Sequence, residues 1–233
     1  MQDPSAAAET PREKLLEAVL PHVVFDGWSE AAFRAAAADI GMALPLARAH
    51  CPRGATDLAA DYHRQGDRAM ASALALASKD GLRFRDKVTL AVRLRLEGAD
   101  REIVRRGAAH FALPQNAAIG AALIWGTADA IWTALGDRSD DINWYSKRAT
   151  LSAVYSSTVL YWLGDESEGH QATWEFLDRR IEGVMQFEKF KAGVRDNPAL
   201  SKLIAGPLRL LDRVRAPGRM ADMPGQMNEG HKG

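Results

Sequence analysis

Side chains that could take part in catalysis are scattered along this 233-residue chain and form no recognisable motif. None of the histidines has the H-E-x-x-H or E-x-x-H spacing that ligates zinc or a di-iron centre. Glu166, Glu168 and His170 lie close together in the sequence, but a solvated acidic loop accounts for them. The six histidines are His22, His50, His63, His110, His170 and His231. The residue types therefore predict neither a metal site nor a catalytic site, and we expect no enzyme activity.

The single cysteine, Cys51, precedes Pro52 and has no histidine-plus-acid set to activate it, so we expect a buried and unreactive thiol. One cysteine cannot form a disulfide within the chain. The sequence also lacks a glycine-rich phosphate loop and a serine nucleophile elbow. These observations favour a protein that binds other molecules over one that transforms them.

The composition is that of a globular protein of ordinary charge. Hydrophobic residues make up 47% and charged residues 26% of the chain. Lys+Arg and Asp+Glu number 30 each, so the formal net charge is zero. Nothing in this balance indicates attraction to nucleic acid.

Apolar residues recur with helical spacing along almost the whole chain, which predicts an all-α fold of about ten helices. We expect these helices at residues 12–25, 30–40, 44–50, 56–78, 84–97, 101–111, 114–135, 142–163, 171–187 and 198–215. The predicted division is a disordered N-terminus (1–11), a helix-turn-helix subdomain (12–65), a lipid-binding and dimerisation domain (66–190), a hinge with an amphipathic helix (191–216) and a disordered tail (217–233).

The first three helices have the lengths and glycine positions of the DNA-binding domain of TetR regulators, which they resemble. Their charges do not suit DNA, because DNA readers normally present a basic face. The charged residues of 29–65 sum to zero: Arg34, Arg48, Arg53 and Arg64 against Glu30, Asp39, Asp57 and Asp61. We therefore expect a degenerate helix-turn-helix, with nucleic acid an improbable partner.

A distinctive run, SDDINWYSKRATL, spans residues 139–151. It is similar to the signature of the ninth Coq protein, a lipid-binding accessory factor of coenzyme Q (ubiquinone) biosynthesis. The likeness continues through AVYSST (153–158) and TWEFLDRRI (173–181), and upstream through LPQN (113–116) and DAIW (129–132). This ordered set identifies the chain as a member of that family.

The resemblance implies a TetR-like fold, a homodimer and an apolar cavity. The cavity would hold a phospholipid or an isoprenoid quinone intermediate as ligand, with no cofactor of its own. The resemblance also implies a partner, demethoxyubiquinone hydroxylase, and a partner-binding patch of Trp144, Tyr145, Asp129 and Ile131.

Without the family, the residues leave two interpretations of Trp144 and Tyr145 open. Neighbouring residues on a helix point about 100° apart, so both cannot sit deep in one narrow stripe. A partly exposed Trp-Tyr pair with a charged rim is typical of an interface hot spot. The alternative is that Trp144 packs under the 136–141 loop as ordinary core.

The helix expected at 114–135 is rich in Ala and Gly, which permits either close helix packing or an open cavity beside it. From the residues alone, tight packing of an Ala-rich helix is the better explanation, whereas the family resemblance implies a lipid-binding tunnel here. The predicted lipid-binding residues are Leu123, Ile124, Leu151, Val154, Tyr155 and Thr158.

The last predicted helix is amphipathic and basic, which is typical of a helix lying on a membrane surface. The same leucines would also suit a helix that docks on the rest of the protein. Its apolar face carries Leu200, Leu203, Ile204, Leu208 and Leu211, and its polar face carries Arg209 and Arg213.

These observations predict a peripheral membrane protein that presents isoprenoid quinone intermediates to demethoxyubiquinone hydroxylase. The alternative is a TetR-type transcriptional regulator with a lipid-like effector. Arg outnumbers Lys, Ala is abundant, and residues 1–14 lack the apolar core of a signal peptide. We therefore expect a bacterial cytoplasmic location, peripheral to the inner membrane.

Overall fold

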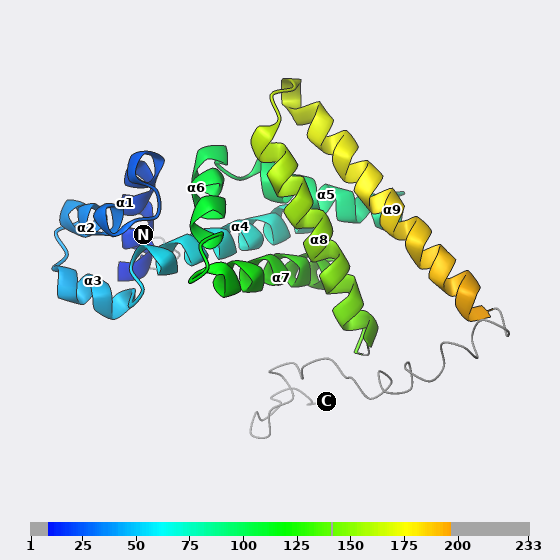
Figure 1. Cartoon of the computed structure of the whole chain (residues 1–233), viewed down its shortest axis with the longest axis horizontal. Helices are drawn as coiled ribbons and strands as arrows, with labels where there is room; N and C mark the ends of the chain where they lie inside the picture. The colour runs from blue at the N-terminus through cyan, green and yellow to red at the C-terminus, as the bar shows by residue number, and fades with distance from the viewer. Residues whose placement is uncertain (1–8, 141, 197–233) are drawn as a thin grey trace, which may run out of the picture.

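The computed structural model describes residues 9–140 and 142–196, and over these residues the chain is helical with no strand. Figure 1 shows the arrangement. The helices are α1 (Pro11–Asp26), α2 (Glu30–Asp39), α3 (Leu44–His50), α4 (Ala55–Leu76), α5 (Phe84–Glu97), α6 (Arg101–Phe111), α7 (Ala117–Ala134), α8 (Ile142–Gly164), the short 3-10 helix η1 (Glu168–His170) and α9 (Gln171–Asp196). The all-α prediction is confirmed.

Side-chain caps fix where several helices begin. Thr10 and Glu13 form a reciprocal capping box at the start of α1. The Ser29 hydroxyl accepts the backbone N–H of Ala32 at the start of α2, and Asp100 caps α6 in the same way. These residues satisfy backbone donors that a helix leaves unpaired at its first turn.

The seventh helix begins at Ala117, three residues later than the sequence predicted from Pro114. Asn116 explains the difference. Its side-chain amide donates to the backbone carbonyl of His110 at 3.1 Å, and its backbone N–H donates to the carbonyl of Leu113 at 2.9 Å. This turn occupies the residues that periodicity alone assigned to the helix.

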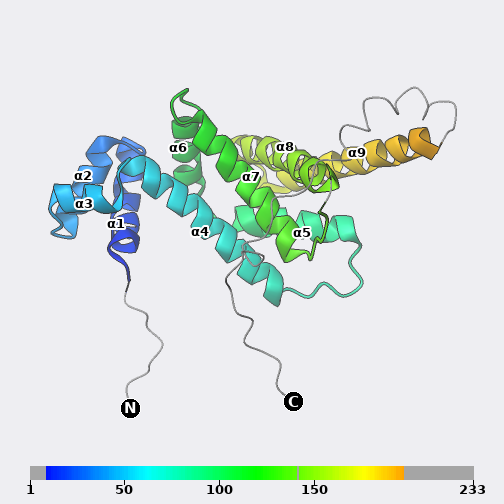
Figure 2. The same cartoon turned by 90° about the horizontal axis from the view of Figure 1, so that it is seen from below.

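Two hydrophobic cores lie along the molecule. The N-terminal core joins α1, α2, α3, α6 and the first half of α4 around Leu15, Phe33 and Leu58. The second core joins α5, α7, α8, α9 and the end of α4 around Leu74 and Leu177. Figures 1 and 2 show α4 running from the N-terminal helices into the larger group. The single long helix α4 therefore contributes to both cores.

The structure bears on only part of the predicted hinge and amphipathic helix. The backbone of α9 continues to Asp196, whereas the sequence placed a helix end at residue 187 and a hinge from residue 191. The α9 range thus contradicts the early part of that hinge. The predicted amphipathic helix, 198–215, lies outside the described residues.

Helix α7 is 18 residues long with a mean hydropathy of 1.2, enough to cross a membrane by length and composition. Helices that pack inside a folded protein pass the same test, and α7 packs against both α4 and α8. This property of α7 is therefore weak support for a membrane span.

Candidate functional site

Three half-buried aromatic side chains form a cluster where α7 meets the first turn of α8. The ring centroids of Trp144 and Tyr145 are 4.8 Å apart. The ring centroid of Trp125 lies 5.9 Å from that of Trp144 and 6.4 Å from that of Tyr145. We call Trp125, Trp144 and Tyr145 the aromatic cluster. The sequence analysis selected Trp144 and Tyr145 but missed Trp125, which comes from the neighbouring helix.

A buried arginine packs against the ring of Trp144 in the aromatic cluster. Only 2% of the Arg148 side chain is exposed. Its guanidinium carbon lies 4.0 Å from the ring centroid of Trp144, and Nη1 donates to the Trp144 carbonyl at 3.2 Å. The spacing of four residues places both side chains on one face of α8. This cation–π contact fixes the orientation of the Trp144 ring.

Two carboxylates neutralise Arg148. Asp129 of α7 accepts from Nε at 2.6 Å, and Asp137 of the α7–α8 loop accepts from Nη1 at 3.0 Å. Burial disfavours the charge on Asp137, but hydrogen bonds from Lys147, Ser139 and Arg148 outweigh it and hold the Asp137 pKa well below its usual range. Asp137 thus stays ionised and ties the loop to α8.

The predicted partner-binding residues do not all lie on one surface of the structure. Asp129 is half-exposed beside the aromatic cluster, whereas Ile131 is fully buried in the second core. Residues two apart on a helix point about 200° apart, so Asp129 and Ile131 cannot share a face. The assignment of Ile131 to the partner surface is wrong. Trp125 lies four residues before Asp129 and therefore shares the face of α7 that carries Asp129, which Ile131 does not.

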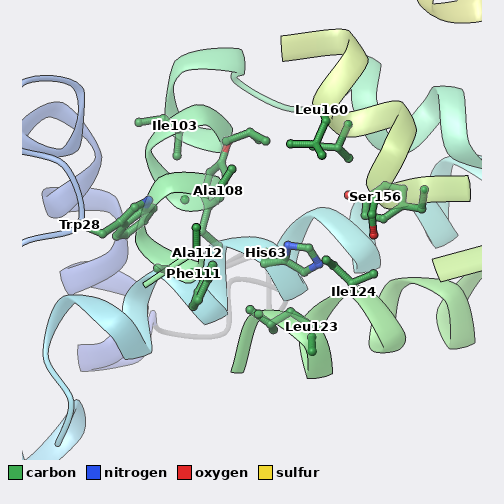
Figure 3. A pocket seen from close by; sticks show the side chains of 18 of the residues that line it. Trp28, His63, Ile103, Ala108, Phe111, Ala112, Leu123, Ile124, Ser156 and Leu160 are labelled. Atoms are coloured by element: carbon green, nitrogen blue, oxygen red, sulfur yellow. The ribbon is translucent and has the colours of Figure 1, made fainter. Parts of the chain in front are cut away.

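A cavity of about 360 Å³ lies where the two hydrophobic cores meet, as Figure 3 shows. This volume falls within the usual range for small-molecule sites. Its wall is almost entirely apolar, with side chains from α4 to α8 and from the α1–α2 turn. The apolar lining residues with buried or half-buried side chains include Trp28, Ala59, Leu96, Ile103, Phe111 and Val159.

A buried polar network forms one side of this cavity. Arg95 pairs with Asp67 at 2.8 Å and donates to the carbonyl of His63 at 3.0 Å. The His63 ring nitrogen Nε2 lies 2.7 Å from the Thr127 hydroxyl, which itself donates to Asp67 at 2.9 Å. Burial lowers the pKa of His63 to about 4, so its ring is neutral at physiological pH.

The predicted lipid-binding residues do not form one tunnel. Leu123, Ile124 and Tyr155 line the cavity, and lipid binding by them stays a prediction. Leu151 and Val154 line a separate pocket of about 260 Å³ between α5, α8 and α9. The structure places them there because successive turns of α8 face different neighbours.

Thr158, the sixth predicted lipid-binding residue, is fully buried, and its hydroxyl donates to the backbone carbonyl of Val154 at 2.8 Å. It lines neither of these two pockets. His63, Trp28 and the α6 residues of the wall were missed, because only the fold brings α6 against α8.

Cys51 is fully buried, and burial raises the pKa of its thiol to about 11. The thiol is therefore protonated at physiological pH and a poor nucleophile. Within residues 9–140 and 142–196, no three His, Cys, Asp or Glu side chains lie close enough to hold a metal ion.

The arginines of the helix-turn-helix are already paired. Arg48 of α3, the helix that would read DNA, pairs with Glu30 and lies 4.9 Å from the Phe33 ring centroid. The remaining pairs of this segment are Arg34–Glu30, Arg53–Asp57, Arg64–Asp61 and Arg12–Asp61. This arrangement leaves few cations for phosphate contacts.

Comparison with known proteins agrees with the residues of the aromatic cluster. The COQ9 family model matches residues 117–188, which include α7, α8 and the start of α9. This chain belongs to the COQ9 family. A probable ubiquinone biosynthesis protein coq9 of Dictyostelium discoideum, described as mitochondrial, is 35% identical over 123 residues, which are 52% of this chain and 40% of that protein.

The mitochondrial ubiquinone biosynthesis protein COQ9 of Drosophila melanogaster is 30% identical over 189 residues, 78% of this chain and 58% of that protein. This COQ9-family chain thus spans about half the length of these relatives. Among solved structures, a TetR transcriptional regulator from Nitrosomonas europaea matches with a TM-score of 0.60 and 17% identity, over 75% of this chain and 98% of that one. The TetR-like fold is confirmed.

The predicted bacterial cytoplasmic location is contradicted by these COQ9 relatives, which are mitochondrial proteins of eukaryotes. The prediction rested on Arg and Ala content and on the composition of residues 1–14.

Proposed function

We propose that this protein is an accessory factor of ubiquinone biosynthesis that acts by binding and not by catalysis. It takes an isoprenoid quinone intermediate or another lipid into the 360 Å³ cavity and presents it to demethoxyubiquinone hydroxylase, which docks on the aromatic cluster. The observation that carries this proposal is the apolar cavity in a chain of the COQ9 family, whose named relatives are ubiquinone biosynthesis proteins.

The physical need for such a factor follows from the substrate. Moving an isoprenoid tail into water costs about 0.8 kcal/mol for each exposed methylene. An apolar cavity removes that cost for the part of the ligand that it covers during transfer from a membrane to an enzyme. Such a role requires no reacting side chain in this protein.

The cavity assignment is tested by filling it. Ala108 lines the cavity on α6, whereas the adjacent Ala109 is exposed. We expect Ala108→Phe to weaken binding of a decyl-substituted benzoquinone at least tenfold, because the new ring occupies the ligand's space. Ala109→Phe is the matched control and should bind as the wild type does. Equal binding by all three proteins, measured by isothermal titration calorimetry, would refute ligand binding in this cavity.

The docking surface is tested with the purified hydroxylase. Trp144→Lys places a charge in the aromatic cluster and should abolish capture of the enzyme, because a desolvated aromatic anchor is lost. Phe25→Lys is the control, since Phe25 is 81% exposed on α1, outside the cluster. Full capture by Trp144→Lys would show that the enzyme docks elsewhere.

The pathway assignment is tested in cells that lack the gene. We expect ubiquinone to fall and demethoxyubiquinone to accumulate. An unchanged quinone profile would refute the proposed role in ubiquinone biosynthesis.

The second candidate function is a TetR-type transcriptional regulator, which the fold match favours. The ion pairs of the helix-turn-helix, among them the pair of Arg48 with Glu30, weigh against this function. A regulator would bind DNA with an affinity that falls steeply as salt rises. We expect no such salt-dependent complex with genomic DNA fragments.

A further inference from the structure

One polar group in the cavity wall stands out because it is buried without a partner. Among the described residues, four buried side-chain atoms lack a hydrogen bond: Trp28 Nε1, Arg101 Nε, Ser152 Oγ and His170 Nδ1. Of these four residues, only Trp28 lines the cavity. Leaving a buried N–H unpaired costs free energy, so the indole N–H favours an acceptor inside the cavity.

The position of Trp28 makes it the inner end of the cavity. The Trp28 side chain is 4% exposed and sits in the turn between α1 and α2, against Tyr62 with ring centroids 6.0 Å apart. Leu160 of α8, which also lines the cavity, is 67% exposed. Figure 3 shows Trp28 and Leu160 at opposite sides of the pocket, with the Trp28 ring nitrogen turned toward α6.

Gly107 of α6 leaves room beside the indole nitrogen. A Cβ at this position would lie 3.7 Å from Trp28 Nε1, which is ordinary van der Waals contact. The missing side chain therefore keeps a space next to the N–H that a methyl group would fill.

The other polar side chains of the wall already have partners. His63 is bonded to Thr127, and Arg95 is bonded to Asp67. Ser156 donates to the carbonyl of Ser152 at 2.6 Å, and the Tyr62 hydroxyl accepts the Asp100 N–H at 3.2 Å. The Trp28 N–H is thus a buried donor of this wall that has no partner within the described protein.

We infer that Trp28 anchors the head group of an amphiphilic ligand, donating a hydrogen bond from Nε1 to a ring or ester oxygen at the inner end of the cavity. This inference rests on the proposed function, because it assumes that the cavity holds a lipid. At roughly 30 Å³ for each water-sized group, the cavity takes on the order of a dozen non-hydrogen atoms. That is a head group and the first carbons of a tail, and the rest of the tail leaves past Leu160.

Three probes with similar tails separate the two sources of an oxygen head group. They are decyl-benzoquinone, methyl laurate and decylbenzene, of which only decylbenzene lacks oxygen. Trp28→Phe removes the N–H and keeps an aromatic ring in the core. We expect it to bind one or both oxygen-bearing probes about threefold to tenfold more weakly, the range of one neutral hydrogen bond, and to bind decylbenzene unchanged.

The matched control is Trp162→Phe, which makes the same change at a buried tryptophan outside this cavity and should alter no affinity. If Trp28→Phe does not fold, Gly107→Ala should give the same selective loss, because its methyl group occupies the space beside the N–H.

The probe that weakens identifies the head group, quinone or ester. Equal weakening for all three probes, or no weakening, overturns the anchor while leaving the cavity as a lipid site. Failure of the wild-type protein to bind any probe instead refutes the proposed function of the cavity, and the anchor with it.

Discussion

Arg148 gives the most quantitative test of the structure around the aromatic cluster. Its guanidinium is 2% exposed and holds Asp129 and Asp137, and the Asp137 side chain is itself only 5% exposed. Arg148→Met keeps most of the side-chain volume and removes the charge. The Asp137 carboxylate would then remain buried with Lys147 as its cationic partner.

Removing one partner of a buried ion pair typically costs about 3–5 kcal/mol. Two features reduce the cost here. Asp129 is 44% exposed, so it can regain water, and Lys147 still neutralises Asp137. We therefore expect Arg148→Met to lower the free energy of unfolding by about 2–4 kcal/mol. With a urea dependence of about 2 kcal/mol per molar, the unfolding midpoint falls by about 1–2 M.

The assay is urea unfolding followed by circular dichroism. The control is Arg34→Met, because Arg34 forms an exposed pair with Glu30 whose loss should cost less than about 1 kcal/mol. Midpoints for the two variants that agree within error would show that Arg148 does not hold the α7–α8 region together. The reasoning about the aromatic cluster would then be refuted as well.

Two further predictions follow from the cavity. Because the folded His63 pKa of about 4 lies below the unfolded value near 6.5, the unfolded chain binds more protons between them. Stability should fall as pH drops from about 6.5 to about 4, by on the order of 2–3 kcal/mol, and urea midpoints of His63→Gln should lose this dependence. Gly120→Ala would place a Cβ 2.8 Å from Phe111 Cβ and should lower the melting temperature, whereas Gly126→Ala on the same helix meets nothing within 4 Å and should raise it.

The order and type of the helices follow from local sequence. Apolar spacing placed α5 and α6 with the same bounds that the structure shows. Ser29 and Asp100 mark helix starts because their side chains accept backbone N–H groups only three residues away. Such interactions are short-range, so the sequence alone contains them.

The aromatic cluster was only partly predictable from the sequence. Trp144 and Tyr145 could be selected as neighbours at a helix start. Trp125 could have been found from its spacing to Asp129, and the error at Ile131 avoided, by counting helix turns. The support from Arg148 depends on α7 and residues 136–140 folding back onto α8.

The cavity was decided by tertiary structure. Leu123 and Tyr155 were predicted to line it, but so were Leu151 and Val154, which face another pocket. Apolar periodicity predicts which face of a helix is buried, but it does not predict which other helix packs against that face. Trp28 lies far from Leu160 in sequence, and the two share a cavity because α4 and α6 join the two hydrophobic cores. The sequence by itself determined the helices and the family signature, and long-range packing determined which of their side chains line the cavity.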